Sequence, residues 1–265
     1  MSLDPQHTPT LSLVTVCRNS SATIKKTIES VLAQKDAGVE YLVVDGLSTD
    51  GTQEIVRSYR GIDRFISEPD GGIADAFNKG IRMASGEIIG LINSDDQLCP
   101  AALATVRRYF ADSPETDVLH GDVLLVEGER VIKRLQPPRR WWYPWRLVLF
   151  NHPATFVRRR VYEERGLFDT RYRIAMDVEI FLRWLANGVK VRYLPQVLVH
   201  MQAGGVSGQQ AILGYREARD AALQHGFSPF LAQLQFMGKL GIWWLLQRLN
   251  RADRLQKKNA SDRKA

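Results

Sequence analysis

The sequence predicts an α/β fold in which helices flank a mostly parallel central sheet. Short apolar runs alternate with helical patterns between residues 11 and 92, and this alternation is typical of a parallel sheet built from βα units. The 265 residues include 45% hydrophobic and 25% charged residues, an ordinary balance for a globular protein with a sizeable core. This length accommodates one large domain or two small ones.

The first hundred residues carry the clearest version of this pattern. Runs rich in β-branched residues predict buried strands at 11–16, 41–44 and 88–92, with a weaker strand at 65–66. Helices are expected at 22–33, 52–59 and 74–83. Ligands of open α/β sheets bind outside the carboxyl ends of the strands, so the turns after these runs are the first place to seek a site.

The pattern changes after residue 100. We expect a helix at 101–110, a strand or hairpin at 117–126, a core-facing helix at 177–186 and an extended segment or strand pair at 189–199. Residues 130–160 carry nine lysines or arginines and no acidic residue. They include the run Trp141, Trp142, Tyr143, Pro144 and Trp145, which suits either a loop over an acceptor or contact with a membrane interface.

Charge and cysteine content narrow the class of protein. The net charge of +7 indicates an anionic partner, and charge alone does not choose among nucleotide phosphates, acidic lipid and nucleic acid. Only two cysteines occur, Cys17 and Cys99, which excludes a disulfide framework or thiolate metal site and favours a reducing, cytosolic compartment. We expect neither a signal peptide nor a transmembrane helix, because the required apolar runs do not occur.

The acidic turn Asn93, Ser94, Asp95 and Asp96 is the strongest single feature. Two adjacent carboxylates at a strand end repel each other unless a cation or a hydrogen-bond donor lies between them. Their hard oxygen atoms suit Mg²⁺ or Mn²⁺ bridging to a diphosphate. The alternative is a solvated turn in which Asp96 caps the helix that begins near Ala101.

Two further polar segments follow predicted strands. Asp45 ends a strand, where its carboxylate can accept a hydrogen bond from a base or a ribose hydroxyl. Ser48, Thr49 and Asp50 after it are better explained as turn and cap residues. The glycine-rich segment 68–80 opens a helix whose backbone N–H groups suit a phosphate or nucleotide, although its spacing is not that of a Walker loop.

Taken together, these segments resemble family-2-type glycosyltransferases with the GT-A fold, especially bacterial enzymes of exopolysaccharide and colanic-acid-type synthesis. The resemblance covers most of residues 11–100 and extends more loosely to about residue 207. It implies a Rossmann-like GT-A (nucleotide-diphospho-sugar transferase) fold and an inverting, metal-dependent hexosyltransferase-type activity. The matching segments are 14–19, 44–52, 67–73, 78–80, 86–89 and 93–96, followed by 151–156, 166–169 and 175–179.

The resemblance also implies a donor site for a UDP- or GDP-sugar. Thr15, Asp45 and Asp75 would contact the nucleoside. Asn93 stands where the family has the first carboxylate of its Asp-x-Asp motif, so it supplies a neutral ligand or a sugar contact. The whole set expected to bind the nucleotide sugar is Thr15, Asp45, Asp70, Asp75, Asn78, Lys79, Asn93 and Ser94.

For the cofactor, Mn²⁺ or Mg²⁺, the resemblance implies that Asp95 is the main ligand and that Asp96 assists. His200 resembles a late metal ligand of some relatives, although a lone histidine on an extended segment is more often structural. The metal would stabilise the charge that grows on the leaving nucleoside diphosphate.

Asp177 falls where the family places its catalytic base, although this chain has Met176 before it in place of the common glutamate. Inverting transfer needs one carboxylate to take the proton of the acceptor hydroxyl. Asp177 and Glu179 are two residues apart, so on a helix their side chains point in different directions and only one should reach the site. We prefer Asp177, at the start of the helix, and Glu179 is the second choice. Glu179 and His152 are expected on the acceptor side, with a packed loop histidine an equal alternative for His152.

We expect three parts in the chain: a disordered segment at 1–10, a GT-A domain at 11–207 and a helical extension with a basic tail at 208–265. The domain would divide into a nucleotide-sugar half at 11–100 and an acceptor half at 101–207. Residues 228 and 229, Ser-Pro, favour a helix start, and the apolar face that follows predicts a helix on a membrane surface, at an oligomer interface or packed on its own domain.

The overall prediction is a cytoplasmic enzyme, peripheral at the inner face of the plasma membrane, that transfers a sugar to a glycan or lipid-linked hydroxyl in cell-surface glycan synthesis. A sugar nucleotidyltransferase is a weaker alternative, because the turn after the first strand, residues 18–21, has no glycine. A non-catalytic carbohydrate- or nucleotide-binding module would leave the carboxylates at successive strand ends unexplained. Nucleic acid is not expected as a partner.

Overall fold

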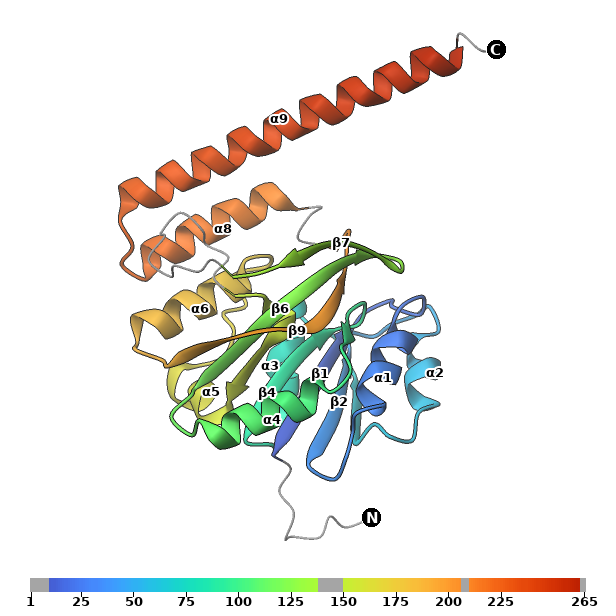
Figure 1. Cartoon of the computed structure of the whole chain (residues 1–265), viewed down its shortest axis with the longest axis vertical. Coiled ribbons are helices and arrows are strands. Elements are labelled where there is room, and N and C mark those ends of the chain that lie inside the picture. The colour runs from blue at the N-terminus through green and yellow to red at the C-terminus, as the bar shows by residue number, and fades with distance from the viewer. Residues whose placement is uncertain (1–9, 138–149, 206–209, 263–265) are drawn as a thin grey trace.

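The α/β prediction is confirmed by the computed structural model, which describes residues 10–137, 150–205 and 210–262 (Figure 1). Within these residues, the strands join one nine-stranded sheet with the order β3-β2-β1-β4-β8-β6-β9-β5, and β7 pairs with β6. The strands are β1 (Leu11–Cys17), β2 (Val39–Asp45), β3 (Arg64–Ser67), β4 (Ile88–Asn93), β5 (Gln97–Leu98), β6 (Val118–Glu127), β7 (Arg130–Leu135), β8 (Thr155–Arg158) and β9 (Val191–Gln202).

The prediction of a mostly parallel sheet holds for one part of it. Strands β3, β2, β1 and β4 are parallel to their neighbours, as the βα repeat predicts. Strand β8 then joins antiparallel to both β4 and β6, and β5 and β7 also pair antiparallel. The sheet is therefore mixed, and the change of direction begins where the local βα repeat of the sequence ends.

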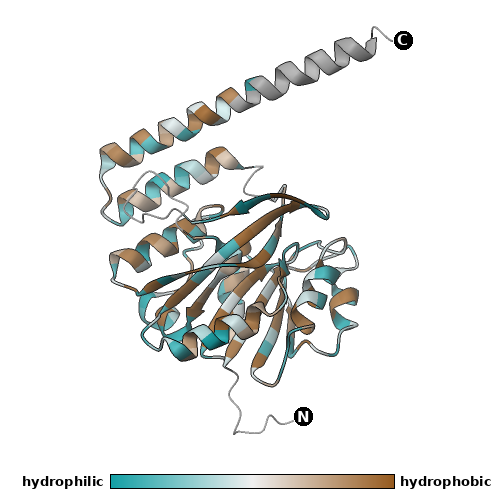
Figure 2. Cartoon of the chain, in the orientation of Figure 1, coloured by the Kyte–Doolittle hydropathy of each residue, from teal (hydrophilic) through white to brown (hydrophobic). Residues whose placement is uncertain are grey.

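Helices cover both faces of the sheet because successive strand residues point to opposite sides. On one face, Val14 and Val16 belong to a hydrophobic cluster that extends through helices α3, α5, α6 and α8, and on the other, Leu13 and Cys17 belong to a cluster with α1, α2 and α4. Figure 2 shows mainly hydrophobic residues along the central strands. The helices are α1 (Ile24–Leu32), α2 (Thr52–Arg57), α3 (Ile73–Met83), α4 (Ala102–Asp112), α5 (Arg159–Arg165), α6 (Met176–Ala186), α8 (Ala211–Gln224) and α9 (Pro229–Asp262), with a 3₁₀ turn, η1 (His152–Ala154).

Several elements differ from the sequence prediction. Residues 189–199, expected as an extended segment or strand pair, contribute to the single long strand β9. The segment 117–126 becomes β6, which forms a hairpin with β7. The short strands β5 and β8 were not predicted, because their pairing partners are distant in sequence. The short helix α5 was also not predicted. The tryptophan-rich run at 141–145 lies outside the described residues.

The C-terminal helices lie against α6 and then leave the body of the protein. Helix α8 packs on α6, and the first part of α9 packs on α8. Beyond that contact α9 continues as a long rod past the sheet (Figure 1). Across the described residues, no helix is both long and apolar enough to span a bilayer. The predicted boundary at residue 207 stays a prediction.

Candidate active site

The predicted polar turns meet at the carboxyl edge of the parallel strands. The register pairs Cys17 with Asp45, Val16 with Asn93, and Asp45 with Ser67. The loops that leave β1, β2, β3 and β4 therefore start from one row of the sheet. This is the edge at which open α/β sheets bind their ligands.

Asp45 organises the loop that follows it. Its side chain is fully buried, and its carboxylate accepts hydrogen bonds from the Ser48 backbone N–H at 3.0 Å, from the Ser67 hydroxyl at 2.7 Å and from the Ser48 hydroxyl. These contacts connect the ends of β2 and β3. In this structure the carboxylate thus shapes the loop, and direct contact with a nucleoside stays a prediction.

The loops after β1 and β2 are held together by hydrogen bonds in both directions. Residues 48–52 form a turn, as the sequence predicts, but the N-cap of α2 is Gly51 and neither Ser48 nor Thr49 caps the helix. Side chains of the turn hold the backbone of residues 19–21. The bonds run from Asn19 N to Ser48 Oγ (2.7 Å), from Ser20 N to Thr52 Oγ1 (2.8 Å), from Ser21 N to Asp50 Oδ2 (3.0 Å) and from Thr49 N to Asn19 Oδ1 (3.0 Å).

Two residues of these loops were missed by the sequence analysis. Leu47 is 47% exposed and has a left-handed backbone with φ of 55°, which is uncommon for a bulky side chain. Such strain persists where the surroundings impose it and is frequent at ligand sites. Arg18 lies against the same turn, since a Cβ atom placed on Gly46 would lie 3.4 Å from Arg18 Cδ and 2.2 Å from Asp70 Oδ2. The position of Arg18 directly after β1 is the signal that could have found it.

The glycine-rich segment forms a compact acidic and basic network at the start of α3. Asp70 accepts a hydrogen bond from the Gly72 N–H, and Asp75 accepts one from the Gly71 N–H, each at 3.0 Å. Lys79 pairs with Glu68 at 2.9 Å and with Asp75 at 3.6 Å. Asp70, beside Gly46, joins this network to the loop after β2.

Thr15 and Asn78, both predicted to bind the nucleotide sugar, have internal roles in the structure. Thr15 is fully buried within β1, and its hydroxyl pairs with the Tyr41 hydroxyl at 3.0 Å. The Asn78 amide donates to the Phe168 carbonyl and accepts from the Phe168 N–H, both at 2.9 Å. Each polar group is buried and bonded inside the protein, so a contact of either residue with the nucleotide sugar stays a prediction.

The acidic turn contains one accessible and one buried carboxylate. Asp95 is partly exposed, whereas Asp96 is 1% exposed and accepts hydrogen bonds from the Asn93 amide at 3.0 Å and the Gln202 N–H at 3.3 Å. Burial, together with the neighbouring Asp95, raises the pKa of Asp96 to about 7, and burial raises the pKa of Asp95. Helix α4 has no side-chain cap, so Asp96 does not fill the alternative role of helix cap.

These carboxylates fit a divalent cation. Burial raises the pKa of both adjacent carboxylates, a cation between them would favour their ionised forms, and carboxylate oxygens are ligands that Mg²⁺ and Mn²⁺ accept. His200 lies on β9 and pairs with Gln97, the residue that directly follows the acidic turn. Within the ranges that the structure describes, no group of three or more His, Cys, Asp or Glu side chains is arranged to hold a metal. The residues fit a cation that takes its remaining ligands from outside the protein.

Ser94 connects this turn to the loop after β1. Its hydroxyl lies 2.8 Å from the Ser20 hydroxyl, and Ser20 is in turn held by Thr52. The structure therefore brings Asp45, the start of α3 and the turn at 93–96 into one group of loops.

Asp177 belongs to a second group of residues, at the start of α6. Its side chain is partly exposed, and burial raises its pKa to about 6, an effect that the ammonium group of Lys239 on α9 partly offsets. One carboxylate oxygen accepts a hydrogen bond from the Val178 N–H at 2.8 Å. A carboxylate that titrates near pH 6 is ionised at neutral pH and still basic enough to accept a proton.

The two predicted acceptor residues both contact other side chains of the protein; Glu179 is buried, and His152 is partly buried. Glu179 is 1% exposed, and its carboxylate binds Arg183 at 2.9 Å and His225 at 2.9 Å. The His152 ring packs 5.1 Å from the Phe77 ring, and burial lowers its pKa to about 4. His152 is thus a packed histidine and Glu179 holds α6 in place, so neither is retained as an acceptor contact.

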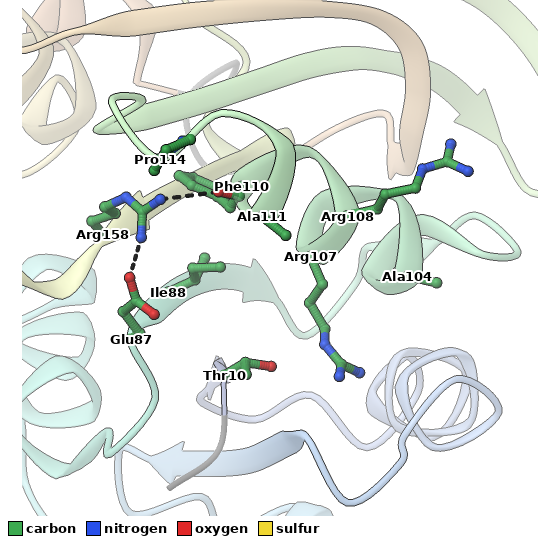
Figure 3. Close-up of a pocket in the computed structure, with 10 residues that line it drawn as sticks. All are labelled: Thr10, Glu87, Ile88, Ala104, Arg107, Arg108, Phe110, Ala111, Pro114 and Arg158. Atoms are coloured by element: carbon green, nitrogen blue, oxygen red, sulfur yellow. Dashed lines mark hydrogen bonds and ion pairs between the residues drawn. The ribbon is translucent and has the colours of Figure 1, made fainter.

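A hollow of about 640 Å³ lies at the opposite edge of the sheet, where β1 and β4 begin (Figure 3). Three of its charged side chains, Glu87, Arg107 and Arg158, make structural contacts. Arg158 pairs with Glu87 and donates to the backbone carbonyl of Phe110, and Arg107 pairs with Asp36 at 2.7 Å. None of the predicted site residues lines this hollow, and we assign it no role in the reaction.

Comparison with known proteins identifies the family of this site. The sequence model described as Glycosyl transferase family 2 matches residues 12–182. The chain belongs to this family. It is therefore a glycosyltransferase, and a biosynthetic relative agrees: a PGL/p-HBAD biosynthesis glycosyltransferase of Mycobacterium tuberculosis is 28% identical over 212 residues, 75% of this chain and 79% of the relative.

Solved structures confirm the GT-A fold of this family-2 glycosyltransferase. S. aureus TarS 1–349 in complex with UDP-GlcNAc superposes with a TM-score of 0.66 and 18% identity, over 87% of this chain and 71% of that one. The mannosyltransferase PcManGT from Pyrobaculum calidifontis, in complex with GDP-Man and Mn²⁺, gives a TM-score of 0.61 and 18% identity, over 95% and 81% of the two chains.

Proposed function

We propose that this glycosyltransferase transfers a sugar from a UDP- or GDP-sugar to a hydroxyl acceptor, with a divalent metal and with inversion at the anomeric carbon. The observation that carries the proposal is that the carboxylates lie in two different places: Asp95 and Asp96 are in the turn after β4, and Asp177 is at the start of α6. Asp95 and Asp96 form an adjacent pair whose ionised forms a cation would favour, whereas Asp177 stands alone with a pKa of about 6. The first suits a metal and diphosphate, and the second suits a general base.

The donor would bind across the loops that leave β1 to β4. Leu47 offers an exposed apolar surface to the base, and Arg18 offers a cation beside Asp70 and the Gly46 turn. Similarity to structures that contain UDP-GlcNAc and GDP-Man supports a nucleotide-sugar donor of this class. The donor residues we propose are Arg18, Asp45, Leu47, Asp70, Asp75, Lys79, Asn93 and Ser94.

Asp95, with Asp96 and His200 beside it, would hold Mn²⁺ or Mg²⁺. A bound cation would neutralise the negative charge of the leaving nucleoside diphosphate. Asn93 cannot carry a charge, but its amide orients Asp96 through their 3.0 Å hydrogen bond. The similar structure that contains Mn²⁺ supports this choice of cofactor.

Asp177 would act as the base. The acceptor hydroxyl loses its proton to Asp177 as its oxygen attacks the anomeric carbon from the side opposite the diphosphate, and this direction of attack inverts the configuration. Burial around Asp177 raises the basicity of the carboxylate, and the hydrogen bond from the Val178 N–H and the positive charge of Lys239 partly offset this effect.

We further propose that the acceptor is a glycan or lipid-linked sugar, used at the cytoplasmic face of the plasma membrane in cell-surface glycan synthesis. The net charge of +7 suits work beside anionic phosphates or lipids. The relative from M. tuberculosis is named as a PGL/p-HBAD biosynthesis glycosyltransferase, which supports a biosynthetic role.

The direct test is hydrolysis of UDP- and GDP-sugars by the full chain with Mn²⁺, with and without a chelator. We expect slow release of UDP or GDP for at least one donor, abolished by the chelator and restored by added Mn²⁺. If UDP or GDP is released at the same rate with and without the chelator, the reaction does not depend on a metal. Failure of both nucleotides to bind under every metal condition would overturn the donor site.

A further inference from the structure

Helix α9 has one face on the protein and one face open to solvent. On the inner face, Ala232 and Gln235 are buried, and the Lys239 ammonium lies 5.4 Å from the centre of the Tyr215 ring of α8. The outer face carries large apolar side chains that are between 45% and 74% exposed. They are Phe230, Leu234, Met237, Trp244 and Leu245.

The spacing of these outer residues makes them one surface. At 3.6 residues per turn, the five positions fall within an arc of about 100° on the helix, with Trp244 at one edge and Leu245 at the other. We call these five residues the outer stripe. Arg248 continues it, and its guanidinium group stacks 3.5 Å from the centre of the Trp244 ring. A run of exposed apolar residues on one side of a helix is typical of an interaction surface.

We propose that the outer stripe docks on a bilayer that contains anionic lipids. The helix combines large apolar and aromatic side chains with basic residues at one end, as in helices that lie in a membrane interface. From residue 248 to residue 258 the sequence has five basic residues and one acidic residue: Arg248, Arg251, Arg254, Lys257 and Lys258 against Asp253. This charge complements an anionic surface, whereas a second copy in parallel would bring like charges together.

Docking in this way would also orient the proposed active site. Lys239 lies on the side of α9 opposite the outer stripe and interacts electrostatically with Asp177. A membrane against the stripe would therefore lie one helix away from the proposed base, within reach of a lipid-linked acceptor. Only this consequence rests on the proposed function, because membrane binding itself needs no catalysis.

Vesicle sedimentation tests the docking surface. We expect the full chain to sediment with phosphatidylcholine vesicles that contain phosphatidylglycerol and not with phosphatidylcholine alone. The double substitution Leu234→Gln with Met237→Gln should weaken that binding by about tenfold or more. Ile242→Gln is the matched control: Ile242 is 62% exposed on the same helix but lies roughly a third of a turn from the stripe. The control should bind as the wild type does.

Three results would overturn this proposal. One is equal binding to neutral and anionic vesicles, and another is wild-type binding by the double variant. The third is a lipid-free dimer, seen by light scattering, that the double variant converts to monomer without losing vesicle binding. Thermal unfolding followed by circular dichroism shows that both variants are folded before these results are compared.

A second inference rests on different contacts, those between α8 and the segment before α6. The Glu217 carboxylate of α8 accepts hydrogen bonds from three consecutive backbone N–H groups: Arg173 at 3.0 Å, Ile174 at 2.8 Å and Ala175 at 2.9 Å. The approach is close, since a Cβ atom on Gly214 would lie 2.9 Å from Ile174 Cγ2. Glu217 thus fixes the backbone two residues before Asp177.

The geometry points to Glu217 as a positioning residue for the base, an assignment that rests on the proposed role of Asp177. The three N–H groups lie just before Met176, the first residue of α6, and an anion close to the N-terminus of a helix is favoured by the helix dipole. Without Glu217, the backbone N–H groups of residues 173–175 would all lose the hydrogen-bond partner that the structure describes for them, and the start of α6 would become less ordered.

Two measurements test this role. In Glu217→Ala, hydrogen exchange at residues 173–175 should accelerate, while Glu217→Gln, which keeps one acceptor oxygen, should fall between Ala and wild type. The kcat for transfer should fall about tenfold in Glu217→Ala, with the dissociation constant of the nucleotide unchanged and partial rescue by Gln. Unchanged exchange, or an equal loss of nucleotide binding and kcat, would overturn it. If the wild type shows no sugar transfer, the proposed function is wrong, but the hydrogen-exchange rates at residues 173–175 still show whether Glu217 holds this segment.

Discussion

The two groups of carboxylates in this protein are held in different ways. In the donor half, residues 11–100, each polar loop is fixed by the next loop of the same edge, as when Ser48 and Asp50 hold the backbone of Asn19 and Ser21. Asp177, in contrast, depends on α8, because Glu217 caps Ala175 from 42 residues further along the chain. The donor half can therefore form from βα neighbours, whereas the base needs the C-terminal helices to be in place.

The substitution Asp177→Asn should have the largest effect, because it changes the proposed base and leaves the carboxylates of the donor half in place. It keeps the shape of the side chain and its acceptor oxygen toward the Val178 N–H, but it removes the basic group. We expect the transfer rate to fall by about 1,000-fold, in the range typical of a lost general base. A radiolabelled sugar-transfer assay measures this, and a fall of less than about tenfold would move the role of base to another residue.

In the donor half, Asp95→Asn should act through the metal. The substitution leaves Asp96 and its bonds from Asn93 and Gln202 in place, but it removes the more accessible carboxylate. We expect the Mn²⁺ concentration needed for half-maximal activity to rise by about 100-fold. Asn93→Asp is the matched control, because it restores a second carboxylate in the turn, and it should not raise that concentration.

Gly46→Ala tests how tightly the donor loops pack. The added Cβ would lie 2.2 Å from Asp70 Oδ2, so the turn or Asp70 must move. We expect a loss of about 1–3 kcal/mol in the free energy of unfolding, measured with urea. Gly238→Ala in α9, where an added Cβ has nothing within 4 Å, should instead gain about 0.5–1 kcal/mol. Equal effects of the two substitutions would contradict this packing.

The pH dependence gives the smallest expected effect. The active form of Asp177 is the ionised one, so kcat should rise with pH through a midpoint near the pKa of about 6. Lys239 lowers this pKa, because its positive charge favours the carboxylate. In Lys239→Met the midpoint should therefore move to higher pH, whereas Lys239→Arg should leave it in place. A midpoint that moves down in Lys239→Met would show that Asp177 is not the group observed.

The sequence predicts the donor half well because its structure is local. Each strand of the βα repeat ends in its own polar turn, which places Asp45 and the residues 93–96 at one edge without knowledge of the rest of the fold. The antiparallel strand β8 breaks the expected parallel order because it pairs with β4 and β6 across long stretches of chain.

The predicted site residues that are enclosed by the protein share one cause. A motif gives the position of a residue along the chain but not the face of the strand or helix on which its side chain lies. Thr15 turns to Tyr41, Asn78 to Phe168 and Glu179 to His225, and each of these partners is at least 26 residues away. Leu47 was missed for the opposite reason, because an apolar residue in a turn gives no chemical signal until its exposure and left-handed backbone are seen.

The measurement that tests the division between donor half and base most directly is calorimetric titration of the nucleotide, UDP or GDP, in the presence of Mn²⁺. It should be made on the wild type, Asp95→Asn and Asp177→Asn in parallel. The account predicts that Asp95→Asn weakens nucleotide binding strongly while Asp177→Asn binds as the wild type does. Equal weakening in both variants, or no change in Asp95→Asn, would contradict it.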